Sequence, residues 1–184
     1  MGLTHAMCKR QNGVDGFIAL YYYNPVLKKI IKSIKYRLVK EGLIEFLKIT
    51  NSSGFEKILF YKNIDNSLRL QPIPLHAKRL KARGFNQSKI IVEYITSALQ
   101  IKQIDILIRE KETAAQAQLA DKKSRFNNIQ GAFTINKNST QNNSNTTILL
   151  VDDVVTSGST VKEAARVLKR GGSEKVYVFS LAKG

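Results

Sequence analysis

Residues 148–172 constrain the fold of this chain more than any other segment, and they read ILLVDDVVTSGSTVKEAARVLKRGG. The aliphatic run at 148–151 predicts a buried strand, and residues 160–169 predict a helix that ends at Gly171-Gly172. Residues 175–181, KVYVFSL, predict a further strand. Strand, helix and strand in this order make a βαβ unit, which places two parallel strands in one sheet.

Two adjacent carboxylates follow the first of these strands. Asp152 and Asp153 lie at its carboxyl end, which is where open α/β sheets bind their ligands. Neighbouring negative charges repel each other, which is costly unless a cation neutralises them or several hydroxyl groups donate hydrogen bonds to them. The vicinal hydroxyls of a sugar meet this need, so we interpret the pair as a site for a sugar diol.

A hydroxyl-rich loop comes directly after the acidic pair and consists of Thr156, Ser157, Gly158, Ser159 and Thr160. The glycine lets the backbone approach an anion, while four hydroxyls and the N-terminal amides of the next helix donate hydrogen bonds. This combination predicts a phosphate-binding loop. A diol site beside a phosphate site matches the geometry of ribose 5-phosphate.

Three other interpretations of the acidic pair explain less. A Walker B acid requires a GxxxxGK[ST] loop, and the sequence contains none. A response-regulator pocket requires a further aspartate and a lysine several strands downstream, and the stretch after Asp153 has no room for them. Acids that only cap a turn leave the neighbouring hydroxyl-rich loop unexplained.

The rest of the chain alternates strands and helices. We expect strands at 15–23, 67–75 and 104–108, and helices from Pro25, over 43–49 and over 88–99. Residues 51–54 and the polar stretch 136–147 predict loops, and residues 114–126 predict a conditionally ordered segment. This order predicts a single α/β domain with a mainly parallel sheet flanked by helices on both faces.

Basic residues dominate the charge of the chain. Lys and Arg number 30 against 14 Asp and Glu, which gives a formal net charge of +16 and a field that attracts polyanions. Residues 74–84 hold Lys78, Arg79, Lys81 and Arg83 without an acid, on a predicted loop directly after a strand. Pyrophosphate needs such a site, and guanidinium groups grip phosphate oxygens in pairs. An ordinary basic surface loop, in contact with nucleic acid or with nothing, is the alternative.

These segments resemble a known family. The acidic pair and the loop after it are similar to the signature of the type I phosphoribosyltransferases, which is four apolar residues, two acids and a Thr/Ser-Gly-Thr/Ser loop. Residues 72–91, PIPLHAKRLKARGFNQSKII, and 109–133, REKETAAQAQLADKKSRFNNIQGAF, resemble segments of the ComF family of competence-associated phosphoribosyltransferase-like proteins. Lys35-Tyr36 also fits that family's pattern.

The resemblance implies a type I phosphoribosyltransferase fold with a flexible hood. It implies binding of phosphoribosyl pyrophosphate with Mg²⁺ and transfer of the phosphoribosyl group at C1 as pyrophosphate leaves. Asp152 and Asp153 would be the catalytic pair that holds the ribose hydroxyls, and Mg²⁺ would be held mainly by the substrate near them. The implied substrate-binding residues are Val154, Thr156, Ser157, Gly158, Ser159 and Thr160 for the 5-phosphate side, Lys78, Arg79 and Arg83 for pyrophosphate, and Arg109, Lys111, Gln116 and Arg125 in the hood.

The start of the chain departs from the family. ComF proteins commonly begin with a cysteine-rich zinc module, whereas this sequence has only Cys8. We expect residues 1–14 to be an N-terminal remnant without a complete zinc module and residues 15–184 to form the phosphoribosyltransferase-like domain. No aliphatic run approaches the roughly 20 residues that cross a bilayer, and no signal-peptide pattern precedes the domain. We therefore expect a cytoplasmic protein without membrane insertion.

Two functions of different classes remain open at this point. The first is a phosphoribosyltransferase whose acceptor base or amine no motif identifies. The second is a non-catalytic single-stranded DNA-binding or uptake protein of natural competence, which uses the same fold and lets its positive charge hold phosphates. Single-stranded DNA or competence proteins would then be its partners, and association with further copies of the chain is left open.

Overall fold

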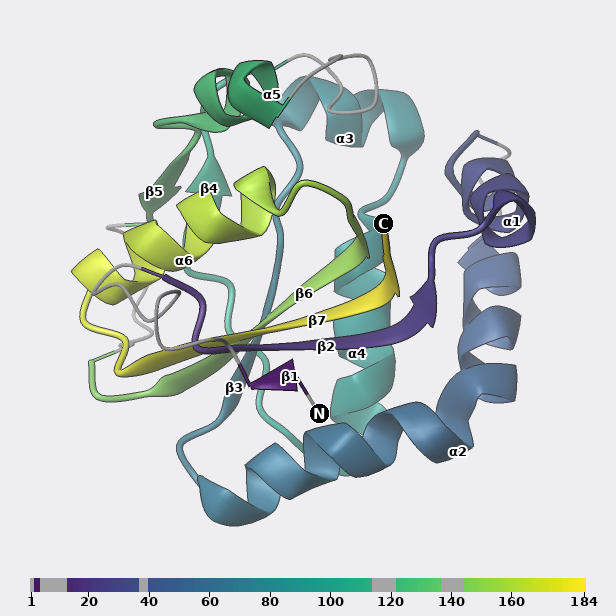
Figure 1. The fold of residues 1–184 in the computed structure, drawn as a ribbon, viewed down its shortest axis with the longest axis horizontal. Helices are drawn as coiled ribbons and strands as arrows, with labels where there is room; N and C mark the ends of the chain where they lie inside the picture. Colours follow the sequence, from purple (N-terminus) through teal and green to yellow (C-terminus); the bar gives the residue numbers. More distant parts are fainter. Residues whose placement is uncertain (1, 4–12, 37–39, 114–121, 137–143) are drawn as a thin grey trace.

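The structure is a computed structural model, which describes residues 2–3, 13–36, 40–113, 122–136 and 144–184. A five-stranded sheet forms its centre (Figure 1). The strand order is β1 (Gly2–Leu3), β2 (Gly16–Tyr22), β7 (Lys175–Lys183), β6 (Thr147–Val155) and β3 (Arg69–Pro72). The last four are parallel neighbours, and β1 pairs antiparallel with β2. The predicted α/β class with a mainly parallel sheet is confirmed.

Helices cover both faces of this sheet, as Figure 1 shows. α6 (Ser159–Arg170) lies on one face, and α2 (Lys40–Ile64) and α4 (Gln87–Leu99) lie on the other. α1 (Pro25–Tyr36) follows β2 at the carboxyl ends of the strands. Among the residues that the structure describes, every helix is too short or too polar to cross a lipid bilayer.

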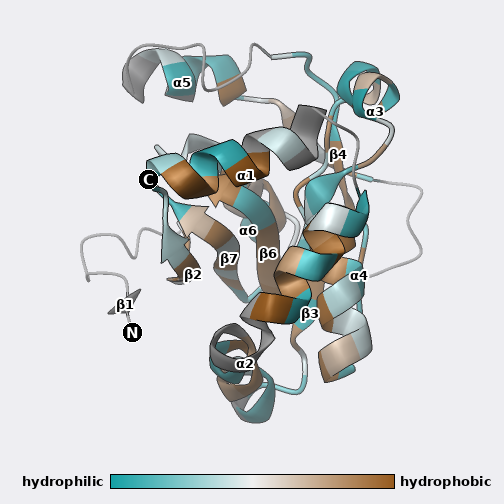
Figure 2. Ribbon diagram, turned by 90° about the vertical axis from the view of Figure 1, so that its right-hand side faces the viewer, coloured by the Kyte–Doolittle hydropathy of each residue, from teal (hydrophilic) through white to brown (hydrophobic). Residues whose placement is uncertain are grey.

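Each face of the sheet carries its own hydrophobic cluster. Leu150 and Val178 pack with Leu168 of α6, whereas Leu149 and Phe179 belong to the cluster under α2 and α4. Successive side chains of a strand point to opposite faces, so a strand covered on both sides is apolar without interruption. α2 and α4 show hydrophilic and hydrophobic patches in Figure 2, as expected for helices with one face in solvent.

The second helix differs from the sequence prediction. A helix over 43–49 with a loop at 51–54 is wrong, because Lys40–Ile64 forms one helix. Leu47 before the expected loop and Phe55 after it are buried in the same core cluster. Packing of both halves therefore outweighs the low helix propensity of Asn, Ser and Gly. Figure 1 shows that α2 changes direction along its length, as helices with interior Gly and Ser do.

A small two-stranded sheet stands apart from the main one and occupies the predicted hood region. β4 (Leu107–Arg109) pairs antiparallel with β5 (Phe133–Ile135), and α5 (Lys122–Ile129) lies between them in sequence. The expected strand at 104–108 is thus shorter and begins later. Buried Gln71 of β3 joins the two sheets, because its Oε1 accepts the backbone N–H of Ile106 at 2.9 Å.

A buried carboxylate fastens the hood to α6. Glu163 is 3% exposed, and its Oε1 accepts the backbone N–H of Gly131 at 2.8 Å. Arg166 donates to the two carboxylate oxygens at 2.8 and 2.5 Å. The hydrogen bond from Arg166 is the main cause that lowers the pKa of Glu163, with a further contribution from the Gly131 N–H. The hood is therefore anchored to the helix that follows the hydroxyl-rich loop.

We expect Glu163→Gln to destabilise the fold by about 1–3 kcal/mol at neutral pH, the value of charge-assisted hydrogen bonds to a buried group. A lowered carboxyl pKa gives stability that is present above the unfolded value of about 4.3 and is lost as pH falls through the folded value. Urea denaturation of both proteins should show the difference shrink at about pH 3. Exposed Glu93→Gln is the control, and an equal difference at both pH values would contradict the expectation.

Candidate functional site

The acidic pair lies in the second half of β6 rather than after it. β6 extends over Thr147–Val155, where Asp152 is half-buried and Asp153 is 8% exposed. Asp152 Oδ1 accepts the backbone N–H of Asp153 at 2.9 Å, and Asp153 Oδ1 accepts that of Val154 at 2.8 Å. A backbone N–H thus holds one oxygen of each carboxylate, and the other oxygen of Asp153 is buried.

The hydroxyl-rich loop joins β6 to α6 in the predicted way. Gly158 has a φ of 73°, the left-handed region that glycine adopts without strain. Gly158 is the N-cap of α6, which begins at Ser159, and it has no side chain to cap the helix, while Ser157 Oγ accepts the N–H of Ser159 at 3.4 Å. The hydroxyls of Ser157 and Ser159 lie 3.0 Å apart. A helix start whose N-cap is a glycine, beside several hydroxyls, is suited to bind an anion.

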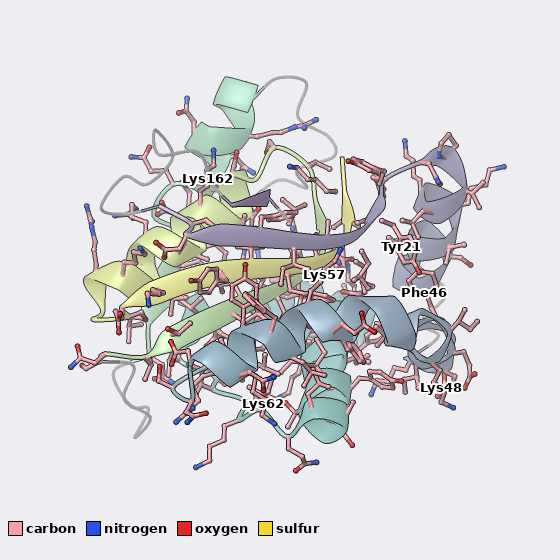
Figure 3. All side chains as sticks on the ribbon, turned by 60° about the horizontal axis from the view of Figure 1, so that its bottom comes forward. Tyr21, Phe46, Lys48, Lys57, Lys62 and Lys162 are labelled. Carbon is pink, nitrogen blue, oxygen red and sulfur yellow. The ribbon has the colours of Figure 1, made fainter. Side chains whose placement is uncertain are left out.

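A lysine that sequence reasoning missed lies beside this loop. Lys162 belongs to the first turn of α6 and is labelled in Figure 3. Its Cε lies 3.8 Å from the position that a Cβ on Gly158 would take. The only available signal was its spacing of four residues from Gly158, which places it one helical turn further on.

Val154 takes part in the site through its backbone and not through its side chain. Its side chain packs against the cluster of Leu27, Ile31 and Ala182, so only its backbone takes part in the acidic region. Thr156 is exposed, while Thr160 is half-buried in the first turn of α6. The structure thus brings together the acidic pair and the loop after it, as the sequence predicts.

The basic stretch forms a helix, so its assignment to a loop is wrong. α3 covers Ala77–Arg83, and the Nδ1 of His76 accepts the backbone N–H of Lys78 at 3.3 Å. Gly84 ends the helix with a φ of 71°, and its N–H donates to the carbonyl oxygen of Leu80 at 2.8 Å. Ala, Lys, Arg and Leu are all strong helix formers, which explains the short helix. His76 therefore has a capping role.

α3 docks on the first residues of the hood. Arg79 donates to the carbonyl oxygen of Thr113, and Lys78 Nζ lies 2.6 Å from Glu112 Oε2. The Lys78–Glu112 pair is exposed, so it contributes little to stability. These contacts hold the predicted pyrophosphate-side residues against the hood.

Arg109 is the buried cation of the site. It lies in β4 with 7% exposure, and its guanidinium stands 5.5 Å from the ring centre of Phe133. Its Nη2 donates to Thr113 Oγ1 at 2.5 Å, and its Nε finds no acceptor among the described residues. Burial and the charge of Arg79 lower the pKa of Arg109 to about 10, while the negative charge of Asp152 raises it.

The charges around Arg109 are those of an anion site. Arg109 feels the positive charges of Arg79 and Arg83 and the negative charge of Asp152. A desolvated cation near other positive charges is unfavourable unless a bound anion compensates its charge. The arrangement therefore favours a ligand with several negative charges, held between α3, β4 and the end of β6.

The other hood residues lie further along the hood. Lys111 is exposed just after β4, and Arg125 is half-buried on α5. Gln116 lies outside the described residues. Arg109 lies close enough to Arg79, Arg83 and Asp152 to feel their charges, and the roles of the arginines and of Lys111 and Arg125 in binding stay predictions.

Sequence reasoning places the start of α4 within one residue, at 88 instead of Gln87, but it missed the contact that Ser88 makes there. Ser88 is 4% exposed, and its Oγ donates to Asp152 Oδ1 at 3.3 Å. Asn86 caps the helix, because its Oδ1 accepts the backbone N–H of Ser88 at 3.0 Å. Its Nδ2 donates to the carbonyl oxygen of Ile73 at 2.9 Å. The contact between Ser88 and Asp152 spans 64 residues of sequence, so no local pattern signals it.

Comparisons with known proteins agree with this geometry. Residues 89–184 match the model of the phosphoribosyl transferase domain family. The chain is 33% identical over 115 residues to Competence protein F of Haemophilus influenzae, which covers 61% of this chain and 48% of that protein. It is 28% identical over 181 residues to Competence protein ComFC of Streptococcus pneumoniae, covering 96% of this chain and 71% of the relative.

A DNA utilization protein, YhgH of Escherichia coli, is 33% identical over 116 residues, which covers 62% of this chain and 49% of that protein. The chain thus spans about half the length of the Haemophilus and Escherichia relatives. The family match includes α4 from residue 89 onward, β6, the hydroxyl-rich loop and α6, and so it contains the acidic pair.

Proposed function

We propose that this chain, which belongs to the phosphoribosyl transferase domain family as a ComF-family phosphoribosyltransferase-like protein, binds phosphoribosyl pyrophosphate with Mg²⁺. It would transfer the 5-phosphoribosyl group to an acceptor and release pyrophosphate. Three features support the proposal most: the paired carboxylates of β6, the start of α6 after them, whose N-cap is a glycine, and buried Arg109, on which Arg79, Asp152 and Arg83 act electrostatically.

Each part of this substrate matches one part of the site. The ribose hydroxyls would donate to the carboxylates of Asp152 and Asp153. The 5-phosphate would accept hydrogen bonds from the N–H groups at the start of α6 and from the hydroxyls around Gly158. The pyrophosphate would lie against Arg79, Arg83 and Lys78 on α3, with Arg109 behind them.

The donor set also fits Mg²⁺, which prefers oxygen ligands and is commonly held by one or two carboxylates together with substrate phosphates. Asp152 and Asp153 are the carboxylates near which the ion would bind. Within the described residues no group of three or more His, Cys, Asp or Glu side chains is arranged to hold a metal ion. When bound, Mg²⁺ would neutralise charge on the pyrophosphate.

The chemistry would be substitution at C1 of the ribose. A bond forms from the acceptor nucleophile to C1, and the bond from C1 to the pyrophosphate oxygen breaks, so the pyrophosphate leaves with the electron pair. Positive charge develops on the sugar and negative charge on the leaving group. The carboxylates of Asp152 and Asp153 would stabilise the first, and the guanidinium groups of Arg79, Arg83 and Arg109 the second. The hood would exclude water from the reacting carbon.

Thermal unfolding of the wild-type protein tests this proposal. Phosphoribosyl pyrophosphate with Mg²⁺ at about 100 times its Kd should add about 2.7 kcal/mol of stability, whereas unphosphorylated ribose with Mg²⁺ should add none. A screen of nucleobases and amines for pyrophosphate release would then identify the acceptor. An unchanged melting temperature at saturating concentrations would contradict the proposal.

A second candidate function is single-stranded DNA binding without catalysis. The net charge of +16 and the names of the relatives, two competence proteins and a DNA utilization protein, favour it. Affinity for a labelled oligo(dT) would then fall steeply with salt, because each phosphate contact releases counterions. It would also survive the double substitution Asp152→Asn with Asp153→Asn. A shallow salt dependence would count against this function.

A further inference from the structure

We infer that Ser88 is a positioning residue of the ribose site: its hydroxyl orients the Asp152 carboxylate that takes the sugar diol. The inference rests on the proposed function and adds to it a residue from α4. It starts from one contact between distant parts of the chain. Ser88 Oγ donates to Asp152 Oδ1 at 3.3 Å, although 64 residues separate the two in sequence.

Two donors converge on the same oxygen of Asp152. Besides the hydroxyl of Ser88, the backbone N–H of Asp153 donates to Asp152 Oδ1 at 2.9 Å. One donor comes from the strand and the other from the helix across the sheet end. Two hydrogen bonds from different directions fix the plane of the carboxylate more narrowly than one does. The carboxylate is thus oriented before any ligand arrives.

The helix does not need the Ser88 hydroxyl for its own start. Asn86 is the N-cap, and its Oδ1 accepts the backbone N–H of Ser88 at 3.0 Å. Its Nδ2 binds the carbonyl oxygen of Ile73 at 2.9 Å, which fastens the helix start to the residues after β3. Since capping and anchoring are supplied by Asn86, the buried hydroxyl of Ser88 is left to act on Asp152.

This role predicts a selective effect on ligands. The diol of ribose 5-phosphate would meet Asp152, whereas inorganic pyrophosphate has no diol and would meet the guanidinium groups of α3 and β4. Loss of a hydrogen bond to a charged group weakens binding by about tenfold. Ser88→Ala should therefore weaken binding of ribose 5-phosphate about tenfold and leave that of pyrophosphate unchanged within about twofold.

Isothermal titration of the whole chain with each ligand in the presence of Mg²⁺ tests the inference. Ser88→Thr keeps a hydroxyl and should retain most of the affinity for ribose 5-phosphate. Ser97→Ala, at an exposed position of the same helix, is the matched control and should bind both ligands as the wild type does. Melting temperatures of the variants without ligand would reveal any loss of the fold.

The outcomes separate this inference from the proposed function. Wild-type protein that binds neither ligand would overturn the proposed function and the inference with it. Wild-type binding that Ser88→Ala leaves unchanged would overturn the role of Ser88 alone. Equal weakening of both ligands, or failure of Ser88→Thr to restore binding in a folded protein, would make Ser88 a structural residue and would also overturn its positioning role.

Discussion

Replacing both Asp152 and Asp153 by Asn should abolish the stabilisation of the protein by phosphoribosyl pyrophosphate with Mg²⁺. The wild type should gain about 2.7 kcal/mol at 100 times its Kd, and the double variant should gain none at the same concentration. The fold should persist, because an amide oxygen can still accept the backbone N–H groups that the two carboxylates bind. Calorimetric unfolding with and without ligand measures both effects.

A charge-matched variant controls this experiment. Glu93→Gln with Asp105→Asn also removes two negative charges, but at exposed positions outside the acidic pair. It should keep the ligand-dependent stabilisation, so that a general change of the electrostatic field can be separated from loss of the diol site. A double variant at 152 and 153 that responds to the ligand as the wild type does would contradict the assignment.

The second large effect concerns Arg109→Met, which should separate stability from binding. The guanidinium of Arg109 is 7% exposed and lies near two other positive charges. Replacing a desolvated charge by an apolar side chain of similar volume is often neutral or stabilising. We therefore expect unfolding without ligand to be unchanged or up to about 1 kcal/mol more costly, and affinity for pyrophosphate to fall about 100-fold.

The destabilisation of the fold by the buried charge of Arg109 should decrease at high pH. The pKa of Arg109 falls to about 10 in the fold, below its ordinary value, so the unfolded chain binds more protons at high pH. The destabilising contribution of Arg109 is therefore fully present below about pH 10 and fades as the pH rises from there toward the ordinary pKa of arginine. Arg109 stays charged at neutral pH, where it would act on an anion.

Urea denaturation and titration calorimetry of Arg109→Met would measure stability and affinity separately. Lys111→Met, which removes an exposed positive charge from the same hood, is the control and should change both quantities little. An Arg109→Met protein that binds pyrophosphate as tightly as the wild type would remove Arg109 from the site. A protein that no longer folds would show that the guanidinium supports the core instead.

The part of the fold that could be predicted is the part set by local pattern. The aliphatic strand, the acidic pair, the glycine and α6 follow one another without interruption within residues 147–170. β7 follows directly and pairs in parallel with β6. Short connections and an apolar run leave few other arrangements for such a segment.

The errors lie where distant contacts decide the structure. The basic residues after Pro74 form α3 because His76 caps them and because Arg79 and Lys78 contact residues 112 and 113. Two prolines nearby indicate extended backbone and say nothing of a helix three residues later. The loop expected at 51–54 is helical for a similar reason, since the residues on both sides pack into one core.

Among the candidate site residues, too, local sequence determines some placements and distant contacts determine others. The placement of the acidic pair and of the hydroxyl-rich loop between β6 and α6 could be predicted because consecutive residues determine it. The burial of Arg109 could not, because it depends on the pairing of β4 with β5, which places Arg109 directly opposite Phe133. The contact of Ser88 with Asp152 joins α4 to β6 across the sheet end and leaves no local trace in the sequence.

The most direct test is a crystal structure of the protein grown with phosphoribosyl pyrophosphate and Mg²⁺. We predict electron density for the sugar at the end of β6, with its diol against Asp152 and Asp153 and its 5-phosphate on the backbone of residues 157–160. An unoccupied β6 end at saturating ligand, or a ligand bound only elsewhere on the molecule, would contradict the assignment of this site.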